Sequence, residues 1–158
     1  MAGVDPRAGL SAFDRDADLA DLRGFLVRAD LTASGPDAPT VRLWLLRGAD
    51  EVVYGSTGFE LSASGGDALI RSVAVDPTRR GHGLGLDLAR FALDRVSEAG
   101  ARRAWLFSRR SGPFRQRLGF EPAGREALAD TLANTHQVNL FRATGQFDHE
   151  VAWSRPLT

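Results

Sequence analysis

The sequence predicts an α/β fold of the α+β kind, with a mixed, mainly antiparallel, twisted sheet of six to seven strands flanked by about four helices. Two observations predict it. Three strand-like runs separated by short turns lie between residues 41 and 75, which is the pattern of an antiparallel meander. A glycine-rich loop, an amphipathic helix over 84–99 and an apolar strand over 104–107 follow, and this order is typical of a crossover between parallel strands.

Each remaining element follows from residue spacing and turn residues. Residues 1–7 are expected to be a disordered tail, so residues 8–158 form one domain. Apolar residues at helical spacing predict helices over 14–30, 84–99, 111–118 and 125–133. Apolar or alternating runs bounded by turn residues predict strands over 8–13, 41–47, 52–61, 68–75, 104–107, 137–142 and 149–155, the last two as a final hairpin.

The composition excludes several classes of function. The formal net charge is zero, which gives no support to a nucleic-acid or membrane partner. The absence of cysteine excludes disulfides, thiolate metal sites and a cysteine nucleophile, and His136 and His149 are too isolated to predict a metal site. No apolar run approaches the ~18 residues of a membrane span, so we expect a soluble, cytoplasmic protein.

An anion site is predicted where the strand over 68–75 ends at Asp76 and Pro77. Gly81, Gly83 and Gly85 follow at alternate positions and lead directly into the next helix. Glycines allow the backbone N–H groups to approach a ligand closely, and the helix dipole adds partial positive charge. This combination most often binds phosphate.

Two motifs in this order resemble those of the GNAT superfamily of acyl-CoA-dependent N-acyltransferases. Arg80, Gly83 and Gly85 form Arg-x-x-Gly-x-Gly after a Val-Ala-Val strand, and the block 114–120 ends in Leu-Gly-Phe. The resemblance covers roughly residues 8–120 by order of elements. It implies acetyl-CoA as the acyl donor without a metal, a small-molecule amine as the acceptor, direct attack through a tetrahedral intermediate, and a homodimer.

The same resemblance implies a set of cofactor-binding positions. The backbone near Val73 would hold the pantetheine arm like an added strand, and the Val73 N–H would donate to the oxyanion. The glycine loop would hold the pyrophosphate. The complete implied cofactor set is Val73, Ala74, Val75, Arg80, Gly81, His82, Gly83, Leu84, Gly85, Ser108 and Phe114.

Glu60 and Arg71 are the candidates for the chemistry and for acceptor recognition. Glu60 is the only carboxylate in the run 52–61, so it is the expected base, directly or through a water. Arg71 lies in an otherwise apolar strand, where an unpaired charge is costly, so it requires a carboxylate partner. That partner is either the ligand or Glu60, and both interpretations stay open.

Residues 69–75 resemble the amino-acid acetylating branch of the family, which includes small enzymes linked to arsenic resistance. Thr135 and Gln137 before the final strand are similar to that branch, whose cysteine-proline element is absent here. The resemblance therefore implies an acceptor with both an amine and a carboxylate, bound by Arg71, Thr135 and Gln137.

The chain departs from the family at Arg115, where many members have a tyrosine. Arginine has a pKa above ~12 and cannot act as a general acid, so protonation of the thiolate falls to Ser108, Ser111 or water. This departure keeps open an acyl-CoA-binding sensor without turnover. A dinucleotide-binding oxidoreductase is disfavoured because Leu86 replaces the last glycine of that fingerprint.

Overall fold

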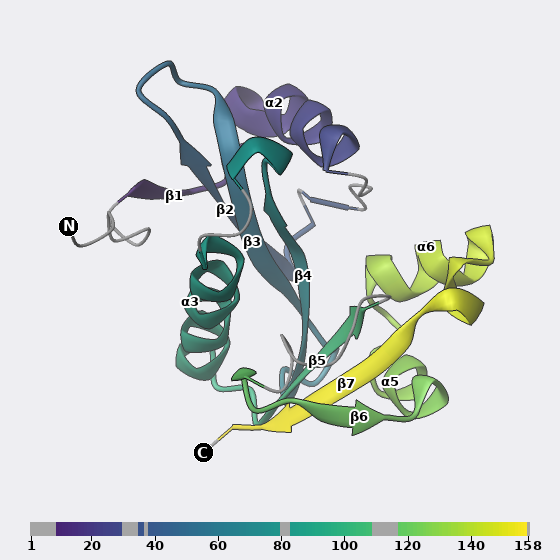
Figure 1. Ribbon diagram of the computed structural model, residues 1–158. Helices are drawn as coiled ribbons and strands as arrows, with labels where there is room; N and C mark the ends of the chain where they lie inside the picture. Colours follow the sequence, from purple (N-terminus) through teal and green to yellow (C-terminus); the bar gives the residue numbers. More distant parts are fainter. Residues whose placement is uncertain (1–8, 30–34, 37, 80–82, 109–116, 158) are drawn as a thin grey trace.

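The computed structural model describes residues 9–29, 35–36, 38–79, 83–108 and 117–157. A seven-stranded sheet in the order β1-β2-β3-β4-β5-β7-β6 forms its centre (Figure 1), which confirms the predicted fold class. The strands are β1 (Leu10–Ala12), β2 (Val41–Arg47), β3 (Val53–Leu61), β4 (Asp67–Val75), β5 (Arg103–Ser108), β6 (Glu121–Ala123) and β7 (Val151–Pro156). The helices are α2 (Arg15–Arg28), α3 (Leu84–Glu98), α5 (Arg125–Thr131) and α6 (His136–Thr144), with 3₁₀ turns η1 (Pro77–Arg79) and η2 (Gln146–His149).

The sheet is antiparallel except at one pair of strands. Strands β1 to β4 form the predicted antiparallel meander. Strands β4 and β5 are parallel and are joined by α3, as predicted for a crossover. Strand β7 pairs antiparallel with both β5 and β6.

Helices cover both faces of the sheet (Figure 1). Helix α3 packs on one face, where Val96 meets Ile70 of β4 and Leu106 of β5. On the other face, α2 covers Leu43 and Leu45 of β2, and a separate cluster joins α5 and α6 to β4 and β5. The second face therefore carries two helical blocks, which reach different ends of the sheet.

A β-bulge in β4 changes which face of the sheet the later residues of the strand point to. The register of β3 with β4 shifts so that the pairs Ser56↔Ala74 and Gly58↔Arg71 leave two β4 residues opposite one β3 residue. Ser72 lies in this bulge with φ of 58°. An extra residue reverses the alternation of the strand. As a result Val73 packs toward α3 and Ala74 packs toward α2.

The predicted final hairpin is wrong in its first strand. Residues 137–142 belong to helix α6, because the Oγ1 of Thr135 accepts a hydrogen bond from the Val138 N–H as an N-cap and Gly145 ends the helix in a left-handed conformation. Val138 and Phe141 are buried at a spacing of three, which fits a helix. Strand β6 takes the place of the predicted partner of β7.

Most other elements match the sequence prediction within a few residues. Helix α5 was expected over 125–133, and the first strand and helix were expected over 8–13 and 14–30. The helix expected over 111–118 lies almost entirely outside the described residues. None of the described helices has the length and apolar character needed to cross a membrane.

Gly58 provides a test of the sheet's packing. A Cβ at this position would lie 2.4 Å from the backbone oxygen of Arg42 and 2.4 Å from a methyl carbon of Leu43. We expect Gly58→Ala to lower the free energy of unfolding by about 1–3 kcal/mol, measured by urea denaturation, because backbone atoms cannot move aside easily. Gly24→Ala, on the exposed side of α2, is the matched control, because a Cβ there would lie at an ordinary contact distance of 3.7 Å from Arg28 Nη1, and it should gain about 0.5–1 kcal/mol. Equal effects of the two substitutions would contradict this explanation.

Candidate active site

The parallel pairing of β4 with β5 ends early and opens the sheet. Pairing covers Asp67 to Leu69 of β4, opposite Arg103 to Trp105 of β5. Beyond Leu69, no β4 residue pairs with β5 in the part of the chain that the structure describes. Strand β5 continues to Ser108 in pairing with β7 instead. The backbone edge of β4 near Val73 is therefore available to an extended ligand that pairs like a strand.

Buried side chains of β3 fix the bulge in place. The Ser56 hydroxyl donates to the Ser72 carbonyl at 2.6 Å, and the Thr57 hydroxyl donates to the Leu88 carbonyl of α3 at 2.7 Å. Both β3 residues are fully buried. A positive φ at a non-glycine residue costs about 1–3 kcal/mol, so such residues persist where surrounding contacts hold them and cluster at functional sites. Here the contacts hold the backbone of Val73 beside the opening.

The N-terminus of α3 lies after β4 and is open to an anion. Gly83 is its N-cap, with φ of 78° and no side-chain hydrogen bond to the first turn. Leu84 and Gly85 form the first turn of α3, so their backbone N–H groups belong to this helix N-terminus. The predicted phosphate-binding residues Arg80, Gly81 and His82 lie outside the described residues.

A short turn leads from β4 toward this helix. The Asp76 carboxylate accepts hydrogen bonds from the Thr78 backbone N–H at 2.9 Å and from the Thr78 hydroxyl at 2.7 Å. These bonds hold the pKa of Asp76 below its usual value. Next to the turn, the Arg79 guanidinium stacks 4.2 Å from the ring centroid of Tyr54, the only tyrosine of the chain. The turn thus ends β4 in a defined geometry.

Glu60 and Arg71 form a buried ion pair. Their Oε1 and Nη1 atoms are 3.2 Å apart, and their side chains are 0% and 1% exposed. Arg71 Nε also donates to the Ser72 hydroxyl at 3.3 Å. Burial lowers the pKa of Arg71, and the charge of Glu60 opposes that shift. Of the two interpretations that the sequence leaves open, the structure contains the internal ion pair.

The second carboxylate oxygen of Glu60 reaches α6. Its Oε2 accepts a hydrogen bond from the His136 backbone N–H at 2.7 Å, so both oxygens of Glu60 are engaged. Thr135 is buried and donates through its hydroxyl to the Leu132 carbonyl, while Gln137 Oε1 is buried and has no hydrogen-bond partner among the described residues. The structure therefore joins Glu60 to the backbone of His136, which lies between the predicted acceptor residues Thr135 and Gln137.

Sequence reasoning missed the contact made by the His136 backbone. The available signal was Thr135 as an N-cap and Gly145 as a C-cap, which together mark a helix starting at this histidine. Other predicted positions stay separate from this group. Ser108 lies buried at the end of β5, and Phe114 lies outside the described residues.

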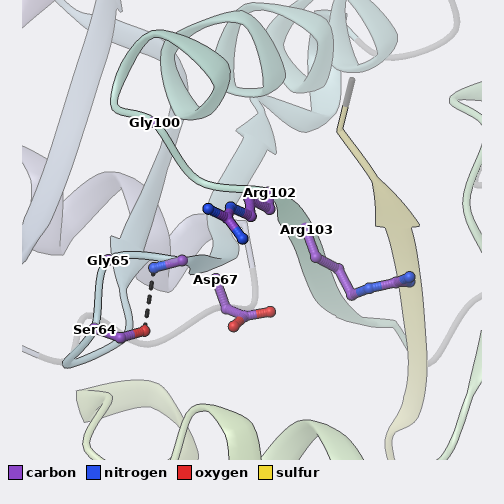
Figure 2. Close-up of a pocket in the computed structure, with 7 residues that line it drawn as sticks. Ser64, Gly65, Asp67, Gly100, Arg102 and Arg103 are labelled. Carbon is purple, nitrogen blue, oxygen red and sulfur yellow. Dashed lines mark hydrogen bonds between the residues drawn. The ribbon is translucent and has the colours of Figure 1, made fainter.

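A second hollow lies at the start of β4 and β5, away from the opening at their ends. Figure 2 shows its lining, with Arg102 directed inward and Arg103 directed toward β7. Its volume is about 640 Å³. Asp67 accepts a hydrogen bond from the Trp105 indole at 2.9 Å, and Arg103 donates to the Ser154 hydroxyl at 3.0 Å. Two of its three charged side chains are thus already used within the protein. Among the described residues, no cluster of three or more histidines and carboxylates could hold a metal.

The buried ion pair predicts that substitutions of its two members have non-additive effects on the free energy of unfolding. Glu60→Leu alone leaves Arg71 as an uncompensated buried charge, and Arg71→Met alone does the same to Glu60. We expect each single variant to lose about 3–5 kcal/mol in the free energy of unfolding, measured by urea denaturation, and the double variant to lose much less. Additive losses in the double variant would contradict the coupling.

The turn at Asp76 predicts a pH dependence with a defined sign. Because its pKa is lower in the folded chain, Asp76 contributes stability above its unfolded pKa and loses it as the pH falls through the folded pKa. Thr78→Ala removes the hydroxyl donor and should raise the Asp76 pKa, measured by NMR titration of the carboxyl carbon. Thr78→Ser keeps the hydroxyl and should leave it low. An unchanged pKa in Thr78→Ala would show that the hydroxyl is not the cause.

The fold is shared with solved structures of acetyltransferases. N-acetylglutamate synthase from Neisseria gonorrhoeae, solved with coenzyme A and N-acetyl-glutamate, superposes with a TM-score of 0.73 at 19% identity. The match covers 94% of this chain but only 35% of that protein. Rv2747 from Mycobacterium tuberculosis, solved with CoA, has a TM-score of 0.68 at 15% identity, with 94% and 99% of the two chains covered. An aminoglycoside 6'-acetyltransferase type Ii has a TM-score of 0.64 at 16% identity, with 93% and 96% covered.

The sequence itself gives the family. A comparison with curated protein sequences finds no match. The family model described as "Acetyltransferase (GNAT) family" matches residues 15–120, more than half of the 158 residues. The matched range contains the β4 bulge, the open N-terminus of α3 and the end of β5. The chain belongs to the GNAT family of acetyltransferases.

Proposed function

We propose that the protein transfers the acetyl group of acetyl-CoA to the amine of a small, amino-acid-like acceptor. The observation that carries this proposal is the early end of the β4–β5 pairing, next to the bulge at Ser72. It combines a strand edge that β5 does not pair beyond Leu69, proposed for the pantetheine arm, with the N-terminus of α3, proposed for the phosphates.

The cofactor would lie along the end of β4 and the start of α3. The backbone of Val73, Ala74 and Val75 would bind the pantetheine arm, and the loop 80–85 would bind the pyrophosphate. Ser108 and Phe114 would line the outer part of the channel. Structural neighbours that contain CoA support acetyl-CoA as the donor.

The chemistry proposed is direct transfer. The neutral amine attacks the thioester carbonyl and forms a C–N bond, and the Val73 N–H donates to the oxyanion of the tetrahedral intermediate. The C–S bond then breaks, CoA leaves as the thiolate, and the thiolate takes a proton from Ser108, Ser111 or water. The amine loses its proton to a base. That Glu60 is this base stays a prediction. Both carboxylate oxygens of Glu60 are already hydrogen-bonded, which favours a positioning role instead.

The acceptor class rests on Arg71. Its Nη1 is paired with Glu60, while Nη2 forms no hydrogen bond to another described residue. A guanidinium with one unused edge suits a carboxylate beside the reacting amine. The neighbour solved with N-acetyl-glutamate supports an amino-acid-like acceptor, and Thr135 and Gln137 would contribute to its binding. A homodimer and a cytoplasmic location stay predictions.

Cofactor binding is tested by ligand-dependent stability. Acetyl-CoA at about 100 times its Kd should raise the free energy of unfolding by about 2.7 kcal/mol, measured by thermal shift, whereas NAD should have no effect. A response to NAD and none to any acyl-CoA would contradict the proposed function.

Turnover distinguishes the enzyme from an acyl-CoA sensor. Release of CoA can be followed with a thiol reagent, because the chain contains no cysteine to give a background signal. L-amino acids should be acetylated faster than the corresponding amines without a carboxylate. Arg71→Lys should raise KM for amino acids at least tenfold and change the Kd of acetyl-CoA little. Tight binding of acetyl-CoA without turnover of any amine would favour the sensor.

A further inference from the structure

Glu60 connects β3 to the neighbouring strand β4 and to α6, which follows much later in the sequence. Its side chain is 0% exposed, and its two oxygens bind Arg71 of β4 and the His136 N–H of α6. Both oxygens of this carboxylate are therefore already bonded within the protein. Glu60 is thus better suited to hold other groups in position than to react itself.

The side chain of His136 extends this connection to the segment between α2 and β2. A Cβ added to Gly35 would lie 2.5 Å from Cγ and 2.6 Å from Nδ1 of the imidazole. The Gly35 backbone therefore lies directly against the ring, with φ of +55°. As a whole residue, His136 is exposed to solvent. Only glycine fits this contact without displacing the histidine.

The contact at Gly35 is tied back to Glu60 through the backbone. The Gly35 carbonyl accepts from the Ala38 N–H at 3.0 Å, and the Ala38 carbonyl accepts from the Val41 N–H at 3.0 Å. Val41 in turn pairs with Glu60 across β2 and β3. Glu60, His136, Gly35 and Val41 therefore form a closed circuit of contacts.

This circuit lies between the two helical blocks on the face opposite α3. Val41 belongs to the cluster under α2, and Leu69, the β4 residue that pairs with Glu60, belongs to the cluster under α5 and α6. Arg71 follows two residues after Leu69 and so points to the same face. Figure 1 shows α2 and α6 on that side of the sheet. The circuit thus includes Glu60, the ion-pair partner of the residue proposed to read the acceptor.

We propose that Glu60 is a positioning residue of the acceptor site, and that His136, held against Gly35, sets the size of acceptor that the site admits. This inference rests on the proposed acetyltransferase function. Glu60 keeps the guanidinium of Arg71 oriented and anchors the first turn of α6. His136, at the exposed rim of that turn, limits the space for the acceptor side chain.

The role of Glu60 is tested by the pH dependence of Glu60→Gln. Gln keeps the shape and the bond to the His136 N–H but loses the charge that holds Arg71. We expect at least a tenfold rise in KM for L-glutamate or L-methionine, with the rising limb of the kcat profile at the same pH as in the wild type. Disappearance of that limb would make Glu60 the base and overturn the positioning role. Glu60→Asp, which keeps the charge, should show a smaller rise in KM, and a rise equal to that of Glu60→Gln would count against positioning.

The role of His136 is tested by relieving an introduced clash. Gly35→Ala should raise KM for L-methionine at least tenfold while the Kd of acetyl-CoA stays unchanged. The double variant Gly35→Ala/His136→Ala should return KM to within threefold of the wild type. Gly65→Ala is the matched control, because Gly65 has a similar φ of +76° but no atom within 4 Å, so it carries the backbone strain without the clash.

The acceptor panel tests the size limit directly. His136→Ala should increase kcat/KM for L-phenylalanine relative to L-alanine by at least tenfold. An unchanged ratio, or a Gly35→Ala defect that His136→Ala does not relieve, would overturn the role of His136 even if the wild type acetylates amino acids. Failure of the wild type to acetylate any amine would instead contradict the proposed function, and the specificity role with it.

Discussion

The bulge at Ser72 is the constraint on which the arrangement of the site depends. A regular β4 would place Arg71 and Val73 on the same face of the sheet. The extra residue instead leaves Arg71 with Glu60 on one face and turns Val73 toward α3 on the other. Within three residues, β4 can therefore present the Arg71 guanidinium to the proposed acceptor and the Val73 backbone to the proposed cofactor. The hydrogen bond from Ser56 to the Ser72 carbonyl keeps the bulge from sliding along the strand.

Burial explains why most polar atoms of the residues around the bulge are hydrogen-bonded. Ser56, Thr57, Glu60 and Arg71 are each no more than 3% exposed, so every unsatisfied polar atom among them would cost free energy. Their partners come from β4, α3 and α6. These contacts therefore fix the geometry of the site and also fasten helices on opposite faces to the same two strands.

The sequence was sufficient for the meander and for the crossover through α3, because both depend on local periodicity and on turn residues. It was not sufficient for the bulge. Residues 69–75 are almost continuously apolar, so a reversal of alternation leaves no trace in their pattern. Helix α6 was missed because a short apolar run over 137–142 fits either period, and only its caps at Thr135 and Gly145 decide. The sequence named Glu60 as one of two possible partners of Arg71, but it could not decide between them, because the contact depends on the register of β3 with β4.

The buried cation of the site is an arginine, Arg71, and this choice of residue determines how the charge of the site responds to pH. Burial lowers the pKa of Arg71, yet arginine starts so high that the guanidinium remains protonated. A lysine under the same burial would readily become neutral and leave the Glu60 carboxylate without its counter-charge. An arginine at this position therefore keeps its positive charge throughout the neutral range. If the protein works as proposed, the rise of its rate with pH then comes from deprotonation of the acceptor amine and its base, while Arg71 keeps its charge.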